Sequence, residues 1–254
     1  MHASFQGQVA VIVGGTTGIG LASARQFAAA GAQVVVAGRD AAKGEAAQSL
    51  LGPASAYVPC DIAQPNSVDG LFQTVMARWG RLDCAVNVAA ITPRVALLHE
   101  TSDSEAAALL DTDVMGTFLC MKRELGIMLK QGSGTIVNVS SVNGLSGVAS
   151  AAMYSAGRHA VLGLTRSAAL EYIPHGIRIN AVCPGATDTP RRRQRVQHLS
   201  PQAQADAMAQ TAKAIPIGRL ATADEIASAI VWLSSPASSY VVGHCLAADG
   251  GLSA

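Results

Sequence analysis

The amino-acid sequence predicts one doubly wound α/β domain over residues 1–254, a length that could also hold two small domains. Short runs rich in Val, Ile and Ala alternate with Ala-rich segments of helical length from one end to the other. Most of these runs are continuously apolar, which is typical of parallel strands covered by helices on both faces. Neither an internal repeat nor a Pro/Gly/Ser linker divides the chain, so a single domain is favoured.

The expected elements follow one another in the order strand, helix. The runs predicted to be strands cover residues 9–13, 34–37, 56–59, 84–88, 135–140, 177–182 and 245–248. The segments predicted to be helices cover residues 19–30, 41–51, 67–79, about 105–130, 150–172 and 222–233. Two of the helices begin with capping boxes, Ser102 with Glu105 and Thr222 with Glu225, in which each side chain satisfies a free backbone N–H.

One stretch interrupts this alternation. Between Pro184 and about Pro216 no strand is expected, and the chain forms a loop or a small helical excursion. An excursion of this length in a compact domain is usually functional. We therefore expect residues of about 184–216 to act as a lid over a site at the carboxyl ends of the strands, where open α/β sheets bind ligands.

Composition excludes several classes of protein. Charged residues make up 14% of the chain, against about a quarter in an ordinary soluble domain, so subunit contacts are expected to cover part of the surface. A net charge of +1 gives no electrostatic basis for binding nucleic acid. The longest apolar runs are of strand length, far below the stretch of about 18 residues that spans a bilayer, so no membrane partner is expected.

The cysteines indicate a reducing compartment. Their spacing matches neither a disulfide framework nor a metal clip, so we expect buried free thiols at Cys60, Cys84, Cys120, Cys183 and Cys245. The first residues carry no basic and hydrophobic pattern of a signal peptide. Both observations favour a cytoplasmic location. The histidines form no metal-ligand pattern, so no metal is expected.

A glycine-rich segment directly follows the first predicted strand and opens the first helix. Its glycine spacing is a variant of the dinucleotide-binding fingerprint. Glycine permits a tight turn and a close backbone approach, and the helix N-terminus offers free N–H groups to a pyrophosphate. The segment therefore predicts a dinucleotide site formed by Gly14, Thr16, Thr17, Gly18, Ile19 and Gly20.

The order of motifs along the chain resembles that of the short-chain dehydrogenase/reductase superfamily. Besides the glycine loop, the resemblance rests on Cys60-Asp61-Ile62, Asn87-Val88-Ala89-Ala90, Ser140-Ser141, Tyr154, residues 179–185, Thr189 and Asp249-Gly250-Gly251. It implies a seven-stranded Rossmann sheet, NAD(P)-dependent oxidoreduction and a homotetramer. It also implies that Asp61 contacts adenine and that residues 87–90 line the ribose. The remaining cofactor contacts implied are Ile62, Asn87, Ala89, Tyr154, Arg158, Pro184, Gly185, Thr187 and Thr189.

The resemblance places the reaction centre at Ser141 and Tyr154. Reduction of a ketone needs a proton donor to the carbonyl oxygen while the cofactor supplies hydride. Tyr154 is expected to be this acid/base, and Ser141 is expected to hydrogen-bond the same oxygen of a small-molecule carbonyl or alcohol substrate. A tyrosine phenol has an ordinary pKa of about 10, so proton exchange near neutrality requires a neighbouring cation.

Two residues depart from the superfamily pattern inside this centre. Arg158 stands four residues after Tyr154, where the superfamily has Lys, and Asp113 stands where it has Asn. Arg158 can hold the ribose and supply positive charge, but a guanidinium is a poor proton relay. We predict that Asp113 and Arg158 form an ion pair. The departures leave an alternative open, a catalytically impaired dinucleotide-binding protein with a sensing or assembly role.

The end of the second predicted strand bears on cofactor choice. Gly38 occupies the position where NAD-selective proteins tend to have an acid, and Arg39 could pair with a 2′-phosphate, so NADP(H) is favoured. Asp40 could instead bind the ribose of NAD(H), or it could cap the following helix. The arginine-rich run at 191–195 likewise has two interpretations, a solvated surface or a clamp for an anionic substrate or the cofactor phosphate.

Overall fold

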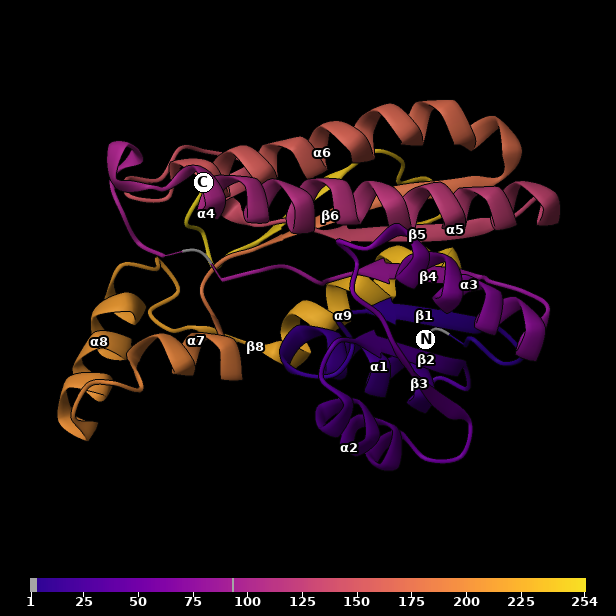
Figure 1. Cartoon of the computed structure of the whole chain (residues 1–254), viewed down its shortest axis with the longest axis horizontal. Coiled ribbons are helices and arrows are strands. Elements are labelled where there is room, and N and C mark those ends of the chain that lie inside the picture. The colour runs from indigo at the N-terminus through magenta and orange to yellow at the C-terminus, as the bar shows by residue number, and fades with distance from the viewer. Residues whose placement is uncertain (1–3, 93) are drawn as a thin grey trace.

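The computed structural model describes residues 4–92 and 94–254. Seven parallel strands form one sheet in the order β3-β2-β1-β4-β5-β6-β9 (Figure 1). The order reverses between β1 and β4, which confirms the doubly wound α/β fold predicted from the sequence. The strands are β1 (Val9–Val13), β2 (Gln33–Gly38), β3 (Ser55–Pro59), β4 (Cys84–Asn87), β5 (Gly134–Val139), β6 (Ile177–Pro184) and β9 (Cys245–Ala248).

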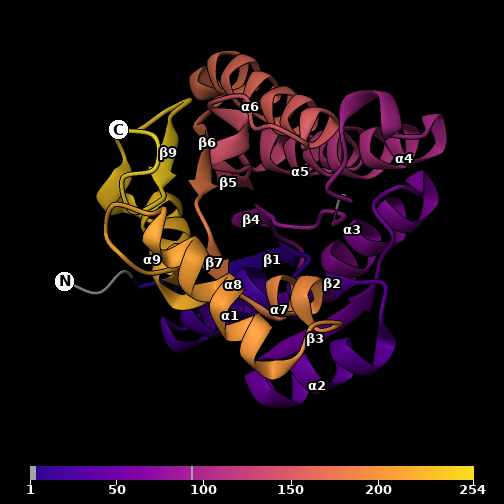
Figure 2. The ribbon, with the colours of Figure 1, turned by 90° about the vertical axis from the view of Figure 1, so that its left-hand side faces the viewer.

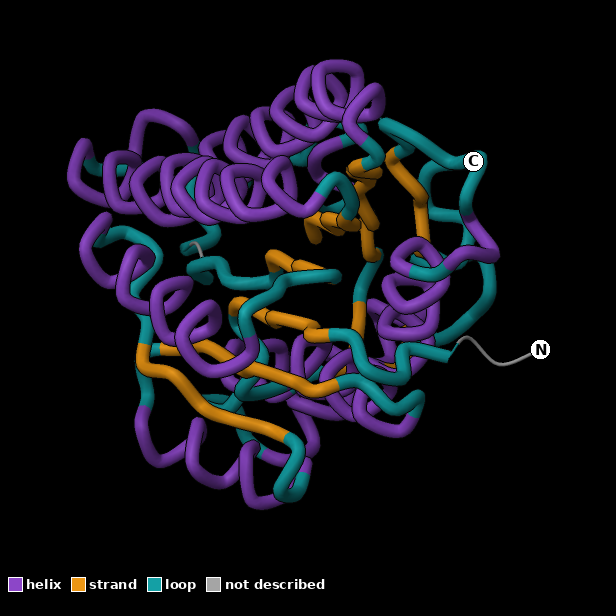
Figure 3. The backbone as a smooth tube through the Cα atoms, turned by 90° about the vertical axis from the view of Figure 1, so that its right-hand side faces the viewer, coloured by secondary structure: helices purple, strands orange, loops and turns teal. Residues whose placement is uncertain are grey.

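Helices cover both faces of the sheet (Figure 3). One hydrophobic core lies between the sheet and the helices α3 (Pro65–Trp79), α5 (Thr117–Gln131) and α6 (Ala152–Tyr172). The second lies between the sheet and the helices α1 (Gly18–Ala29), α2 (Ala41–Leu51) and α9 (Ala223–Ser234). Successive residues of β1 alternate between these cores, because Val11 packs into the first and Ile12 into the second. This double burial explains why the strand is continuously apolar.

The helix predicted over about 105–130 is interrupted. It starts at the predicted capping box of Ser102 and Glu105 as α4 (Asp103–Leu109), and a π-helical segment, η2 (Leu110–Gly116), separates it from α5. Wider π-helical turns often occur at functional sites. Asp113 lies on this segment and is fully buried, so the irregular turn directs its carboxylate into the protein.

The excursion over about 184–216 differs from the prediction in one respect. A two-residue strand, β7 (Thr187–Asp188), pairs with β8 (Ala221–Thr222), although no strand was expected there. Two residues are too short to produce a hydrophobic run, so the sequence carries no strand signal at this point. The rest of the excursion forms the helices α7 (Pro190–Val196) and α8 (Pro201–Lys213), which stand beside the carboxyl ends of the strands (Figure 2). Closure of this segment as a lid stays a prediction.

Three predicted features of composition can be compared with the structure. The five cysteines are free thiols; four are buried and Cys245 is partly exposed. Within the part of the chain that the structure describes, no helix combines the length and apolar character needed to cross a membrane. Among the same residues, no group of three or more His, Cys, Asp or Glu side chains could hold a metal ion.

Candidate active site

Two adjoining cavities lie at the carboxyl ends of the strands. The larger has a volume of about 560 Å³ and contains Ser141 and Tyr154 in its wall. The smaller, of about 300 Å³, runs along the glycine loop between β1 and α1. Residues such as Ile19 and Thr189 line both, so the two cavities lie side by side. This position, next to the point where the strand order reverses between β1 and β4, is where doubly wound sheets bind dinucleotides.

The glycine loop packs closely against neighbouring backbone, and the helix that follows it begins with free N–H groups. Gly14 has a φ of 84°, and a Cβ at this position would come within 2.6 Å of the Ala89 nitrogen. Thr17 is the N-cap of α1 but makes no side-chain hydrogen bond to the helix, so the first N–H groups of α1 are available to an anion. Gly20 lies outside the cavity, where a Cβ would come within 2.1 Å of the Gly14 carbonyl oxygen. The free N–H groups at the start of α1 fit the pyrophosphate of a dinucleotide.

The far end of the smaller cavity carries charged residues after β2. Asp40 accepts a hydrogen bond from the Lys43 N–H at 3.1 Å and forms an ion pair with the Lys43 ammonium at 2.7 Å. The interpretation of Asp40 as a helix cap is therefore confirmed, and its carboxylate is already neutralised. Arg39 lines the same end of the cavity and is exposed. The local charge is consequently suited to a phosphate group.

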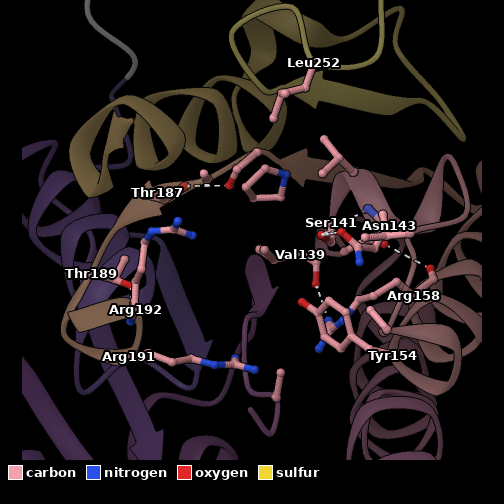
Figure 4. Close-up of a pocket in the computed structure, with 18 of the residues that line it drawn as sticks. Val139, Ser141, Asn143, Tyr154, Arg158, Thr187, Thr189, Arg191, Arg192 and Leu252 are labelled. Carbon is pink, nitrogen blue, oxygen red and sulfur yellow. Dashed lines mark hydrogen bonds between the residues drawn. The ribbon is translucent and has the colours of Figure 1, made fainter. Parts of the chain in front are cut away.

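Ser141 and Tyr154 come to one wall of the larger cavity from different elements (Figure 4). Ser141 follows β5, and its hydroxyl accepts a hydrogen bond from the Asn143 N–H at 3.2 Å. Tyr154 lies in the first turn of α6 and is half-buried. A substrate oxygen in this cavity can therefore meet two hydroxyl groups held by a strand end and a helix.

Arg158 lies one helical turn after Tyr154 and is buried with Asp113. Its guanidinium carbon lies 4.9 Å from the centroid of the Tyr154 ring. Its Nη2 donates a hydrogen bond to Asp113 Oδ2, and its Nη1 donates to the Val139 carbonyl oxygen at 3.1 Å. Asp113 Oδ1 also accepts the Ile91 N–H at 2.9 Å. The ion pair predicted between Asp113 and Arg158 is thus present, and it fixes the cation beneath the tyrosine ring.

The predicted site residues separate into two groups. Most of them line one of the two cavities, namely Gly14, Thr16, Thr17, Gly18, Ile19, Arg39, Asp61, Ile62, Ala89, Ser141, Tyr154, Arg158, Pro184, Gly185, Thr187 and Thr189. Gly20, Asn87 and Asp113 do not line either cavity. Asn143, which no sequence motif singled out, lines the larger cavity beside Ser141.

A family model described as enoyl-(acyl carrier protein) reductase matches residues 13–253. A 2,5-dichloro-2,5-cyclohexadiene-1,4-diol dehydrogenase from Sphingobium indicum is 42% identical over 252 residues, which cover 98% of each chain. The chain belongs to the short-chain dehydrogenase/reductase superfamily. A cis-4-hydroxycyclohexanecarboxylate dehydrogenase from Sinomonas cyclohexanicum is also 42% identical, over the full length of both chains, a match of 258 aligned positions.

Solved structures of this superfamily have the same fold. Levodione reductase superposes with a TM-score of 0.93 at 32% identity, covering 97% of this chain and 98% of that one. A variant of actinorhodin polyketide ketoreductase with NADPH superposes with a TM-score of 0.91 at 33% identity, covering 96% and 97%. The chain is therefore an oxidoreductase that interconverts a ketone and a secondary alcohol with a nicotinamide dinucleotide. The comparisons give no support to the catalytically impaired alternative.

A buried polar network lies behind the nucleotide cavity. The Asn87 amide donates hydrogen bonds to Glu124 Oε2 at 3.1 Å and to Asn138 Oδ1 at 3.0 Å, so this side chain points into the core and does not line the nucleotide cavity. Glu124 is fully buried, and its Oε1 has no hydrogen-bond partner among the described residues. Burial raises the pKa of Glu124 to about 8. In the sequence, Glu124 lies four residues after Cys120 and four before Met128, so all three share one face of α5 and are buried. This spacing was the available signal for a buried carboxylate.

This network predicts a pH-dependent stability. Because the pKa of Glu124 is about 8 in the folded chain and about 4.5 when exposed, the folded state retains a proton that the unfolded state releases. Stability should therefore fall as pH rises from about 4.5 to about 8, by at most about 1.4 kcal/mol per pH unit. Glu124→Gln, which cannot ionise, should lose this dependence in urea unfolding measured across that range. Glu45 is exposed, so Glu45→Gln is the control and should keep the pH dependence of the wild type. Parallel curves of unfolding free energy against pH for wild type and Glu124→Gln would contradict the prediction.

Proposed function

We propose that the chain oxidises a secondary alcohol on a six-membered ring, or reduces the corresponding cyclic ketone. The observation that carries this proposal is the wall formed by Ser141, Tyr154 and Arg158 in a cavity of about 560 Å³ that adjoins the nucleotide cavity. Support for the ring comes from two relatives over nearly the whole chain, one named for a cyclohexadiene-diol and one for a hydroxycyclohexanecarboxylate.

The wall residues divide the chemistry among them. A dinucleotide held along the glycine loop would supply the hydride for a ketone carbon, or take it up from an alcohol carbon. The Tyr154 phenol exchanges the proton of the substrate oxygen, and the Ser141 hydroxyl holds that oxygen in place. Arg158, with its guanidinium 4.9 Å from the ring centroid, stabilises negative charge that develops on the phenol. Asp113 acts through Arg158 and is a positioning residue, replacing the neutral Asn of the superfamily pattern.

A test of this proposal uses the purified protein, NADP⁺ and a panel of alcohols. The panel contains 4-hydroxycyclohexanecarboxylate, its carboxamide, cyclohexanol and the open-chain 2-hexanol, with NADPH formation followed by absorbance. Turnover is expected for ring alcohols and should be weakest for 2-hexanol. A preference for the open-chain alcohol, or no turnover of any ring alcohol, would contradict the proposal.

We further propose that NADP(H) is the preferred cofactor. Support comes from the absence of an acid at Gly38, from the neutralisation of Asp40 by Lys43 at 2.7 Å, and from the exposed Arg39 at the cavity edge. A 2′-phosphate would gain a charge-assisted hydrogen bond from Arg39.

Arg39→Ala should therefore weaken NADP⁺ binding by about 10- to 100-fold, the value of one hydrogen bond to a charged group. Binding of NAD⁺, which has no 2′-phosphate, should change little. Titration by calorimetry measures both, and Arg78→Ala, an exposed arginine on α3 away from the cavities, is the control. Equal losses for the two nucleotides, or tighter binding of NAD⁺ by the wild type, would contradict the preference.

We also propose a homotetramer located in the cytoplasm. The charged fraction of 14% and the exposed apolar side chains of Met115, Phe118, Leu129 and Leu170 support burial of helix surfaces between subunits. The free thiols support a reducing compartment. Light scattering of the purified protein gives the mass that tests the assembly.

A further inference from the structure

The larger cavity has a strongly one-sided charge. Among the described residues that line it, five are arginines and none is Asp or Glu. Two of these arginines are paired with carboxylates that do not line the cavity, Arg94 with Glu105 at 3.0 Å and Arg158 with Asp113. The other three, Arg191, Arg192 and Arg195, make no ion pair within the described part of the chain. The cavity therefore carries positive charge that the protein itself does not compensate.

These three arginines come from α7, and Figure 4 shows Arg191 and Arg192 across the cavity from Ser141 and Tyr154. Arg192 Nη2 donates a hydrogen bond to Thr211 Oγ1 at 2.7 Å, which holds the guanidinium in place. Its Nε is buried and has no partner among the described residues. An N–H donor left in this state is costly unless a ligand accepts it.

The same helix supplies an internal comparison. Arg193 points away from this cavity and forms two hydrogen bonds with the carboxylate of Asp188, at 2.8 and 2.7 Å. Arg193 is thus satisfied, whereas Arg192 next to it is not. The arginine run consequently divides into Arg193, which forms a surface ion pair, and the cavity arginines Arg191, Arg192 and Arg195.

The electrostatics of the cavity arginines favour the binding of an anion. Burial is the first cause that lowers the pKa of the Arg192 guanidinium, and the nearby charge of Arg195 adds to it. A negatively charged group between Arg192 and Arg195 would offset both the burial of the guanidinium and the repulsion between the two cations. Arg191 differs from Arg192 and Arg195 in its surroundings, because it also lines the nucleotide cavity and donates a hydrogen bond to Thr92 Oγ1 at 2.6 Å.

We propose that the substrate carries a carboxylate in addition to its reacting hydroxyl or ketone, and that Arg192, assisted by Arg195, binds this carboxylate. The inference rests on the proposed oxidation of a ring alcohol and names its substrate class. An oxyanion could also come from the cofactor, whose expected contacts Pro184, Gly185 and Thr187 line the larger cavity too. Arg192 and Arg195, however, do not line the cavity along the glycine loop, where the pyrophosphate is expected. Binding at this wall orients the ring, because the carboxylate and the reacting oxygen are held from opposite sides of the cavity.

The test compares two substrates that differ in charge and hardly in size, 4-hydroxycyclohexanecarboxylate and 4-hydroxycyclohexanecarboxamide. The wild type should have a kcat/KM about 10- to 100-fold higher for the carboxylate. Arg192→Gln should remove most of this preference by raising KM for the carboxylate, whereas Arg193→Gln should keep it. Binding of cyclohexanecarboxylate, measured by calorimetry with NADP⁺ present, should weaken in Arg192→Gln to the same extent.

The possible results separate the inference from the function on which it rests. If the wild type oxidises the carboxamide as efficiently as the carboxylate, the inference is overturned and oxidation of a ring alcohol stands. If neither compound is oxidised, the proposed function fails and the inference fails with it. If Arg192→Gln weakens NADP⁺ binding but keeps the carboxylate preference, the arginines serve the cofactor phosphate and the inference is likewise overturned.

Discussion

Replacing Tyr154 by Phe is expected to lower kcat by about 10²- to 10⁴-fold, the contribution typical of a positioned acid/base group. The phenol is the group on the cavity wall that can exchange a proton with a substrate oxygen, and Phe lacks it. The ring itself is kept, so its contact with the Arg158 guanidinium, 4.9 Å from the centroid, is retained. The change should therefore remove the proton step without disturbing the buried cation.

Steady-state kinetics and nucleotide titration check this expectation together. Dinucleotide affinity should change little in Tyr154→Phe, because the glycine loop and the ends of β2 and β3 supply most of the nucleotide cavity. Tyr172→Phe, at the other end of α6, is the matched control and should keep kcat close to that of the wild type. A kcat for Tyr154→Phe within a few-fold of the wild type would show that the acid/base group lies elsewhere.

Much of the fold was predictable because a strand that is buried on both faces of the sheet needs apolar residues at successive positions, and such a run is visible in the sequence. β1 was predicted with its observed bounds, and β6 extends two residues beyond the predicted 177–182. The π-helical segment was not predictable, since its residues have the composition of an ordinary helix and the wider turn depends on packing with other elements. β7 was missed because its pairing with β8 is a tertiary contact of two residues.

The site was predictable where position along the chain determines position in space. The glycine loop directly follows β1, and Ser141 lies two residues after the end of β5, so the parallel sheet brings them to the same edge. Side-chain direction was not determined in this way. Asn87 also ends a strand, yet its amide turns toward Glu124, which approaches from a helix far along the chain. The division of the arginine run likewise depends on Asp188, whose carboxylate engages Arg193 and leaves Arg192 to the cavity.

The buried ion pair predicts the largest change in stability. Asp113→Ala leaves Arg158, 3% exposed, with an uncompensated charge and also removes the acceptor of the Ile91 N–H. Removal of one partner of a buried pair costs about 3–5 kcal/mol. The expected loss should appear in urea unfolding at fixed protein concentration. Asp69→Ala breaks the more exposed pair with Arg123, at 2.8 Å, and should cost below about 1 kcal/mol.

A double variant separates the pair from the isolated charge. Asp113→Leu combined with Arg158→Met replaces both ions by apolar side chains of similar volume, and such exchanges are often neutral or stabilising. The double variant should therefore be more stable than Asp113→Ala, although it should lack activity because the cation beside Tyr154 is gone. A loss below about 1 kcal/mol for Asp113→Ala, equal to that of Asp69→Ala, would show that Arg158 tolerates its charge without Asp113. The expected loss of about 3–5 kcal/mol would instead show that Asp113 is the residue that allows the Arg158 charge to be buried beside Tyr154.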